Sequence, residues 1–172
     1  LTGPSLVWDK TGAILDVLIE DMDMDSVLGC WYRQVNILLT QLDWPEPELA
    51  HRRYENGFNL VLAAPLDRLY AATLLLETAW YFCCCELLDV ETQDSDVLIR
   101  DIHDQIQAER NQAMLNLQVA AAEHSVDFLV DDDTVTVGHG EESISWDIDA
   151  IPPLEQIDWS AVHDVPVALI TG

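Results

Sequence analysis

The pattern of hydrophobic and polar positions predicts short strands that alternate with three long helices. Residues 6–8 and 13–20 have strand-like patterning, and in the second segment every residue of one face is apolar: Ala13, Leu15, Val17 and Ile19. Lys10, Thr11 and Gly12 separate the two segments and predict a hairpin turn, because glycine accepts the backbone angles of tight turns. A further apolar run at residues 58–63 predicts another strand.

Three stretches show the three- and four-residue spacing of buried helix faces. They cover residues 26–42, about residues 66–88 and about residues 95–123. Ser26 suits the N-cap of the first helix, because its hydroxyl can accept a hydrogen bond from the first turn. Pro65 precedes the second helix, where a missing amide donor does no harm.

Three short strands follow at residues 127–130, 134–137 and 143–148, and a linker runs from Pro152 to Asp164. The turn residues between these strands predict a small meander. The whole pattern predicts an α+β fold, in which about three helices cover a mixed sheet. That sheet would contain the N-terminal hairpin, the strand near residues 58–63 and the late meander.

Charge narrows the classes of partner. The 172-residue chain has 32 acidic residues against seven lysines and arginines, for a formal net charge of −25. Proteins bind phosphate backbones and anionic lipids through lysine and arginine, which are scarce in this chain. We therefore expect neither nucleic acid nor a membrane as partner. The acidity either attracts a cationic partner or serves solubility and salt adaptation. The chain shows no secretory signal pattern and no apolar run of membrane-spanning length, so the expected location is the cytoplasm.

The four cysteines are Cys30 and the consecutive Cys83, Cys84 and Cys85. Adjacent residues of a helix point in different directions, so the triplet cannot form one tetrahedral metal site by itself. We therefore expect the cysteines to pack as small apolar residues in a reducing compartment.

Two acidic features are candidates for chemistry. Asp131, Asp132 and Asp133 could ligate calcium or magnesium, but they lack the ligand spacing of an EF-hand loop, and a polar hairpin tip is the alternative. Glu77 lies in an apolar helix and is either a functional carboxylate with a raised pKa or the ion-pair partner of an arginine such as Arg68. We assign no catalytic residue and no metal ligand from the sequence.

Arg52 and Arg53 stand out because cations are scarce elsewhere. They begin Arg-Arg-Tyr-Glu-Asn-Gly-Phe, residues 52–58, in the only basic cluster of the chain. Guanidinium groups beside a Gly-Phe turn can hold the carboxylates of a peptide-like ligand by paired hydrogen bonds. They can equally neutralise the protein's own acidic surface. Arg52 and Arg53 are the candidate substrate-binding residues.

The last six residues, Val-Ala-Leu-Ile-Thr-Gly, have the pattern of a buried strand that leads into a glycine turn. A phosphate-binding loop needs glycines for close backbone approach, a lysine for the outer phosphates and a hydroxyl for magnesium. Thr171 and Gly172 would begin such a loop and are the candidate nucleotide-binding residues. The alternative is an ordinary strand that ends in Thr-Gly.

Taken together, these segments resemble the N-terminal region of cyanophycin synthetase-like proteins of the Mur-ligase family. The opening Leu-Thr-Gly-Pro-Ser is similar to the family's Leu-x-Gly-Pro-Asn, and residues 52–58 are similar to its Arg-Gly-Tyr-Pro-Gly-Gly-Phe turn. Arg53, Glu55 and Asn56 replace glycine, proline and glycine there. Residues 165–172 match the strand before the Mur-ligase phosphate loop, which continues Thr-Asn-Gly-Lys-Thr.

The resemblance implies a cyanophycin synthetase-like N-terminal domain at residues 1–150. Residues 151–172 would be a linker and the first strand of a Mur-ligase-type ATP-binding domain. The parent would then be a ligase that uses ATP and Mg²⁺ to activate a carboxylate as an acyl phosphate, which an amine attacks. This chain would dock an amino-acid or peptide-like acceptor through Arg52 and Arg53, without a cofactor or activity of its own.

The alternative is a non-enzymatic acidic interaction domain that binds a cationic peptide or polymer. Its motivation is the formal net charge of −25. The sequence does not identify the amino acid that is joined, the acceptor or the oligomeric state.

Overall fold

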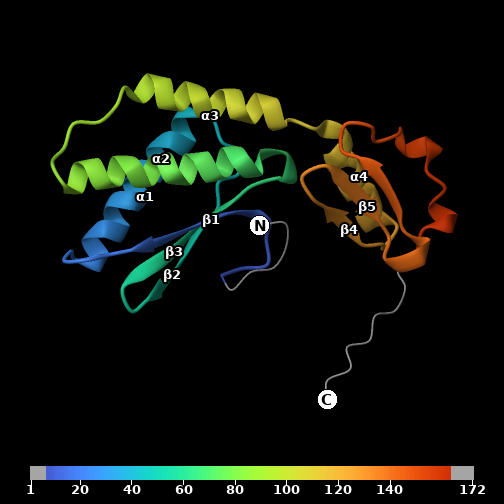
Figure 1. Ribbon diagram of the computed structural model, residues 1–172, viewed down its shortest axis with the longest axis horizontal. Coiled ribbons are helices and arrows are strands. Elements are labelled where there is room, and N and C mark those ends of the chain that lie inside the picture. The colour runs from blue at the N-terminus through green and yellow to red at the C-terminus, as the bar shows by residue number, and fades with distance from the viewer. Residues whose placement is uncertain (1–6, 164–172) are drawn as a thin grey trace, which may run out of the picture. The chain divides into compact units, whose positions relative to one another are not determined.

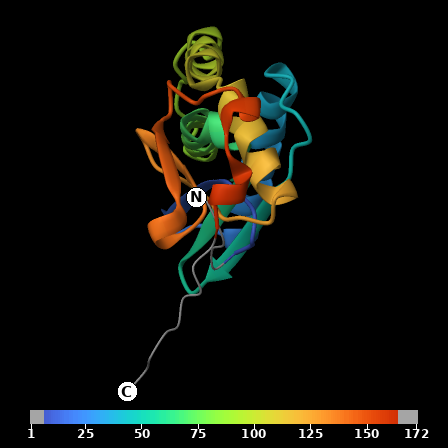
Figure 2. The ribbon, with the colours of Figure 1, turned by 90° about the vertical axis from the view of Figure 1, so that its right-hand side faces the viewer.

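The computed structural model describes residues 7–163, and the chain divides after Arg110 into two compact units (Figures 1 and 2). We call them the N-terminal unit and the C-terminal unit. Among the described residues, four α-helices accompany two three-stranded antiparallel sheets. The predicted α+β class is confirmed. The assignment of residues 1–150 to one family domain stays a prediction.

The N-terminal unit contains one sheet and three α-helices. Its elements are β1 (Gly12–Leu18), α1 (Met24–Gln41), β2 (Leu49–Tyr54), β3 (Gly57–Ala63), the short 3₁₀ helix Leu66–Arg68, α2 (Leu69–Leu87) and α3 (Ser95–Glu109). The strand order is β1-β3-β2, and each pair is antiparallel. Figures 1 and 2 both show α2 between this sheet and α3.

The predicted N-terminal hairpin is wrong. β1 pairs with β3, and its Val17 lies opposite Phe58, while Val7 and Trp8 lie outside any strand. The hairpin of this sheet instead joins β2 to β3 through a two-residue turn, Glu55 and Asn56. β1 pairs better with the strongly apolar β3, because that pairing buries its alternate apolar residues under the helices.

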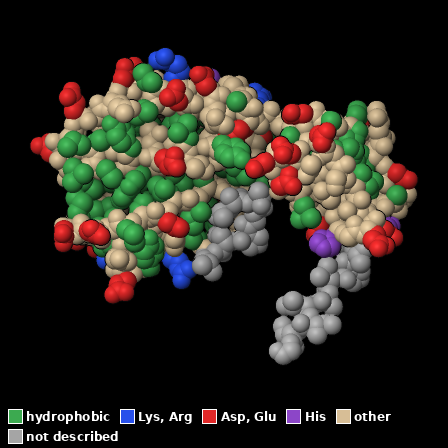
Figure 3. Space-filling model, in the orientation of Figure 1, with side chains coloured by type: hydrophobic (Ala, Val, Ile, Leu, Met, Phe, Trp, Pro, Cys, Tyr) green, Lys and Arg blue, Asp and Glu red, His purple; other side chains and the backbone are tan. Residues whose placement is uncertain are grey.

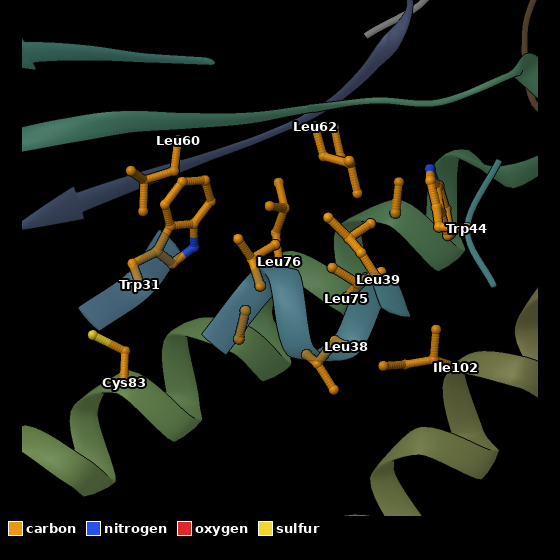
Figure 4. Close-up of a cluster of buried hydrophobic side chains, with 14 of the residues drawn as sticks. Trp31, Leu38, Leu39, Trp44, Leu60, Leu62, Leu75, Leu76, Cys83 and Ile102 are labelled. Carbon is orange, nitrogen blue, oxygen red and sulfur yellow. The ribbon is translucent and has the colours of Figure 1, made fainter. Parts of the chain in front are cut away.

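The core of the N-terminal unit lies between the inner face of the sheet and the helices (Figure 4). Leu60 and Leu62 of β3 contribute to this core, together with Trp31 of α1 and Leu75 and Leu76 of α2. Each of these five side chains is at most 1% exposed. Burial of one such apolar side chain stabilises the fold by about 1.5–3 kcal/mol.

The start of α1 also differs from the prediction. The N-cap is Asp23, whose carboxylate accepts hydrogen bonds from the Ser26 amide at 2.8 Å and from the Ser26 hydroxyl at 2.7 Å. Ser26 therefore lies in the first turn. A carboxylate is the better cap here, because it also interacts favourably with the positive end of the helix dipole.

The C-terminal unit contains the second sheet. Its elements are α4 (Gln112–Glu123), β4 (Phe128–Val130), β5 (Thr134–Val137) and β6 (Ile144–Asp147), with the short 3₁₀ helices Gly140–Glu142, Leu154–Gln156 and Trp159–Ala161. The strands form an antiparallel meander in the order β4-β5-β6, as predicted. The meander forms a sheet of its own, so the expected single mixed sheet is wrong.

The third predicted helix is two helices. It breaks at Arg110, whose ψ of 116° is extended, and α4 then starts with Asn111 as its N-cap. Asn111 accepts a hydrogen bond from the Met114 amide at 2.9 Å and donates one to the Ile148 carbonyl at 3.0 Å. Asparagine favours such caps over a helix interior, because its side chain competes for backbone hydrogen bonds.

Within residues 7–163, none of the helices combines the length and the apolar character that crossing a bilayer requires.

Candidate functional site

Arg52 and Arg53 lie on β2 and not in the turn that follows it. Successive residues of a strand point to opposite faces of the sheet. Arg53 lies opposite Phe58, which belongs to the buried, helix-covered face, whereas Arg52 lies opposite Asn59 on the other face. The two guanidinium groups therefore extend from opposite faces of one strand.

Arg53 has an acidic partner within the protein. Its guanidinium lies 2.8 Å from the carboxylate of Asp25, in the first turn of α1. Both side chains are exposed, at 54% for Arg53 and 80% for Asp25. Exposed pairs of this kind contribute only about 0–1 kcal/mol, so another carboxylate can replace Asp25 at little cost.

Arg52 ends a row of three polar residues that crosses the outer face of the sheet. Asp16 of β1, Asn59 of β3 and Arg52 of β2 lie directly opposite one another. Within this row, the Asn59 side-chain amide donates a hydrogen bond to the Asp16 carboxylate. Arg52 is exposed, and no ion pair within residues 7–163 includes it.

His51 is part of the same strand, and the sequence alone assigns it no role. Its Nδ1 lies 2.9 Å from the hydroxyl of Tyr32, and its ring makes edge contacts with the rings of Tyr32 and Phe58. Partial burial raises the pKa of the Tyr32 phenol. In the sequence, His51 directly precedes the two arginines, and this position could have drawn attention to it. Its contact with Tyr32 of α1 is long-range, so no local pattern predicts it.

β2 is also an edge strand, and its backbone has hydrogen-bonding groups that β3 does not use. The pairs Tyr54–Gly57 and Arg52–Asn59 exchange backbone hydrogen bonds, since they follow a two-residue turn in antiparallel register. The amides and carbonyls of Leu49, His51 and Arg53 consequently point away from the sheet. Within the described part of the chain, no hydrogen bond occupies these outward groups.

Within residues 7–163, most acidic side chains form no ion pair with lysine or arginine. Figure 3 shows Asp and Glu side chains scattered over the visible surface, with few lysines and arginines. Among residues 7–163, the ion pairs that involve lysine or arginine are Lys10–Glu48, Arg33–Glu86 and Arg53–Asp25. Arg52 and Arg53 thus place two guanidinium groups on one strand of an acidic protein.

A groove of about 430 Å³ lies between α1, the end of α2 and the start of α3. Its lining combines the apolar Ile37 and Val90 with the acidic Glu86 and Asp89. The amide of Gln34 donates a hydrogen bond to Glu86 at 2.7 Å and lowers the pKa of that carboxyl group.

The acidic triplet, residues 131–133, lies at the turn between β4 and β5. Asp131 accepts hydrogen bonds from the Asp133 amide at 3.1 Å and from the amide and hydroxyl of Thr134 at 2.8 and 2.9 Å. These bonds fix the hairpin tip between β4 and β5. No group of three or more His, Cys, Asp or Glu side chains within residues 7–163 is arranged to hold a metal ion.

Glu77 is exposed on α2, and residues 7–163 include no ion pair between it and Arg68. Arg68 instead lies over the ring of Trp44, 5.9 Å from the ring centre. The predicted Arg68–Glu77 pair is therefore wrong. The cation–π contact keeps the Arg68 side chain against the indole instead.

The cysteines pack in the N-terminal unit, as expected. Cys30, Cys83 and Cys85 are buried, and Cys84 is partly exposed. The Cys83 thiol lies 3.7 Å from the Val27 carbonyl oxygen, and burial raises the pKa of this thiol strongly. All four are free thiols.

The candidate nucleotide-binding residues Thr171 and Gly172 lie outside the described residues, as do the opening segment and residues 165–170. In comparisons with known proteins, no protein-family model matches the chain, and a search of curated proteins finds no significant match. The Mur-ligase resemblance therefore stays a prediction.

Proposed function

We propose that the chain is the acceptor-docking domain of an ATP-dependent, amide-bond-forming ligase of the Mur-ligase family. The observation that carries this proposal is the sequence Val-Pro-Val-Ala-Leu-Ile-Thr-Gly at residues 165–172, which resembles the strand before the Mur-ligase phosphate loop. The folded units before it fit an accessory role, because the exposed Arg52 offers a binding group on a strand of the sheet.

In this proposal, ATP and Mg²⁺ belong to the parent's nucleotide-binding domain, where they supply the activation of the carboxylate. The residues of this chain bind and orient the acceptor. Arg52 presents two parallel N–H donors, which match the two oxygens of a carboxylate. Holding the acceptor near the activated group replaces an encounter in solution by an effectively intramolecular step, and this positioning accelerates amide formation.

Three measurements test the proposal. The coding sequence after Gly172 should encode a Gly-Lys-Ser or Gly-Lys-Thr within several residues. In the complete protein, phosphate release from ATP should depend on an amino-acid or peptide acceptor. Arg52→Gln should then raise the KM for the acceptor and leave the KM for ATP unchanged, whereas Arg100→Gln, an exposed arginine on α3, should change neither. Absence of the loop sequence or of ATP turnover would refute the ligase assignment.

The second candidate function is an acidic interaction domain for a cationic peptide or polymer. The groove between α1, α2 and α3 favours it, because Glu86 and Asp89 lie beside exposed apolar side chains there. An arginine-rich peptide with apolar residues would match both features. Titration with such a peptide should show binding that weakens with salt and weakens in Glu86→Gln and Asp89→Asn variants. An absent or salt-independent signal would refute this function.

A further inference from the structure

The edge of β2 combines two features that point to one kind of ligand. The outward amides and carbonyls of Leu49, His51 and Arg53 can continue the sheet by pairing with another extended chain. The side chains of His51, Arg52 and Arg53 are exposed beside these groups. The edge therefore offers main-chain hydrogen bonds beside two guanidinium groups.

A second copy of β2 is a poorer occupant than an acidic strand. Residues Leu49–Tyr54 include no carboxylate that could pair with Arg52 or Arg53. A strand that carries carboxylates at these positions would instead form opposite-charge pairs across the new interface.

The alternation of side chains defines the sequence of such a strand. Arg52 and Arg53 are consecutive, so they extend from opposite faces of the sheet. Consecutive residues of an added strand also extend from opposite faces. Two adjacent acidic residues would therefore place one carboxylate near Arg52 and the other near Arg53.

We propose that β2 binds an extended peptide segment with two adjacent acidic residues by strand addition. The use of Arg52 and Arg53 as contact residues rests on the proposed function. The inference adds the class of ligand and the way in which its main chain binds. In the free protein, Asp25 forms an ion pair with Arg53, and the incoming carboxylate displaces it. The exposed pair is weak, so this exchange costs little.

The first test uses the protein and a capped peptide of about eight residues, which spans the six residues of β2. The probe has a central Glu-Glu pair flanked by Thr and Val, and its control has Gln-Gln. Fluorescence anisotropy of the labelled probe should show saturable binding, with the control about twofold to fivefold weaker, because the new ion pairs are exposed. Equal binding of both peptides, or of neither, would overturn the proposal.

N-methylation of the probe tests strand addition without changing the protein. Alternate amides of an added strand face β2, and the remaining amides point away. Methyl groups on one alternate set should abolish binding, and methyl groups on the other set should leave it within about twofold. If both sets behave alike, the ligand does not bind as a strand.

Protein variants form the second test. His51→Pro removes an outward amide, while His51→Ala removes the same ring contacts and keeps the amide. His51→Pro should weaken binding about tenfold more than His51→Ala does. Thermal unfolding must first show that both variants fold; should His51→Pro not fold, the methylated peptides decide the question alone.

Asp25→Asn should strengthen binding of the probe, whereas the His51 variants weaken it. It removes the carboxylate that competes for Arg53, so affinity for the Glu-Glu probe should rise about twofold to fivefold. Asp101→Asn, an exposed residue of α3, makes the same charge change and serves as control. Equal effects of the two substitutions would mean that general charge, and not the Arg53 site, controls binding.

These outcomes are distinguishable from failure of the proposed function. A protein without ATP turnover can still bind the probe as a strand, and that result would refute the ligase assignment alone. A ligase whose acceptor KM depends on Arg52 but whose probe binding ignores N-methylation would refute strand addition alone.

Discussion

The carboxylate of Glu109, the last residue of α3, accepts a hydrogen bond from the amide of Ala71 in the first turn of α2, at 2.6 Å. Its other oxygen accepts one from the Tyr70 amide at 2.8 Å. α2 has no side-chain cap of its own and no acidic residue in its first turn. Glu109 therefore supplies both the cap and the negative charge that a helix N-terminus favours.

Glu109→Gln should destabilise the N-terminal unit. Glutamine keeps one acceptor oxygen but loses the charge, so we expect a loss of about 1 kcal/mol in the free energy of unfolding, and about 2 kcal/mol for Glu109→Ala. Urea denaturation monitored by circular dichroism measures the loss. Asp101→Asn on the same helix should have little effect. Equal effects of Glu109→Gln and Asp101→Asn would show that the cap contributes nothing.

Gly57, at the start of β3, should not tolerate a side chain. A Cβ atom there would lie 2.0 Å from the Val17 carbonyl oxygen and 2.6 Å from the Tyr54 hydroxyl oxygen. The same hydroxyl donates a hydrogen bond to the Val17 carbonyl at 2.7 Å. We expect Gly57→Ala to cost about 2–3 kcal/mol of stability, because the strands must separate to admit a methyl group.

Gly29 provides the matched control for Gly57. It lies exposed in α1, and apart from its chain neighbours and the adjacent helix backbone no atom of the described residues lies within 4 Å of the position that a Cβ would take. Gly29→Ala should therefore stabilise the protein by about 0.5–1 kcal/mol, because alanine loses less backbone entropy in a helix. Thermal melts of the two variants should shift in opposite directions, and a shared direction would contradict the packing described around Gly57.

Local patterns predicted much of the fold. The apolar spacing located α1 and α2, and the turn residues located the three strands of the meander, because these signals depend on neighbours in the sequence. The pairing of β1 with β3 could not be predicted in this way. It depends on a long-range match of buried faces, while the Lys10-Thr11-Gly12 segment suggested a local hairpin.

The helix break had a weak sequence signal. Apolar periodicity continues through Arg110, and no proline or glycine marks the boundary, so residues 95–123 had the pattern of one helix. The signal was Asn111, a good N-cap residue, but its bond to the Ile148 carbonyl is a tertiary contact. The cap by Glu109 was likewise unpredictable, since it joins two helices across a separation of 38 residues.

The sequence alone selects Arg52 and Arg53 as candidate residues, and their role in binding stays a prediction, but it does not give their geometry. Arg52 and Arg53 were singled out by their rarity in an acidic chain, and that reasoning needed only composition. Their placement on a strand, and hence on opposite faces, follows from the pairing of β2 with β3. The Asp25 contact of Arg53 depends on how α1 packs, which no local pattern encodes.

The cysteines should differ in reactivity. Burial raises the pKa of Cys30, Cys83 and Cys84, so the thiolates that react with alkylating reagents are scarce at neutral pH. Cys30 and Cys83 are also inaccessible, whereas Cys84 is partly exposed. Iodoacetamide labelling followed by mass spectrometry should modify Cys84 before Cys30 and Cys83, and all four rapidly in denaturant. Fast native labelling of Cys83 would contradict its burial.

Asp131 should make part of the stability depend on pH. Hydrogen bonds from the Thr134 amide, the Asp133 amide and the Thr134 hydroxyl hold the pKa of Asp131 below its ordinary value in the folded protein. The folded state therefore binds the proton more weakly than the unfolded state. The resulting stabilisation is complete above the unfolded pKa of about 4, and it is lost as the pH falls through the lower folded pKa.

Asp131→Asn removes this titration while it retains an acceptor oxygen. The melting temperature of the native protein should exceed that of Asp131→Asn at pH 7, and the difference should shrink as the pH falls below about 4. Asp149→Asn, an exposed residue near the end of the same sheet, makes the same change in net charge and controls for general repulsion. If the two variants respond identically to pH, the hydrogen bonds to Asp131 do not stabilise its charged form, and the hairpin tip is held by its backbone pairing alone.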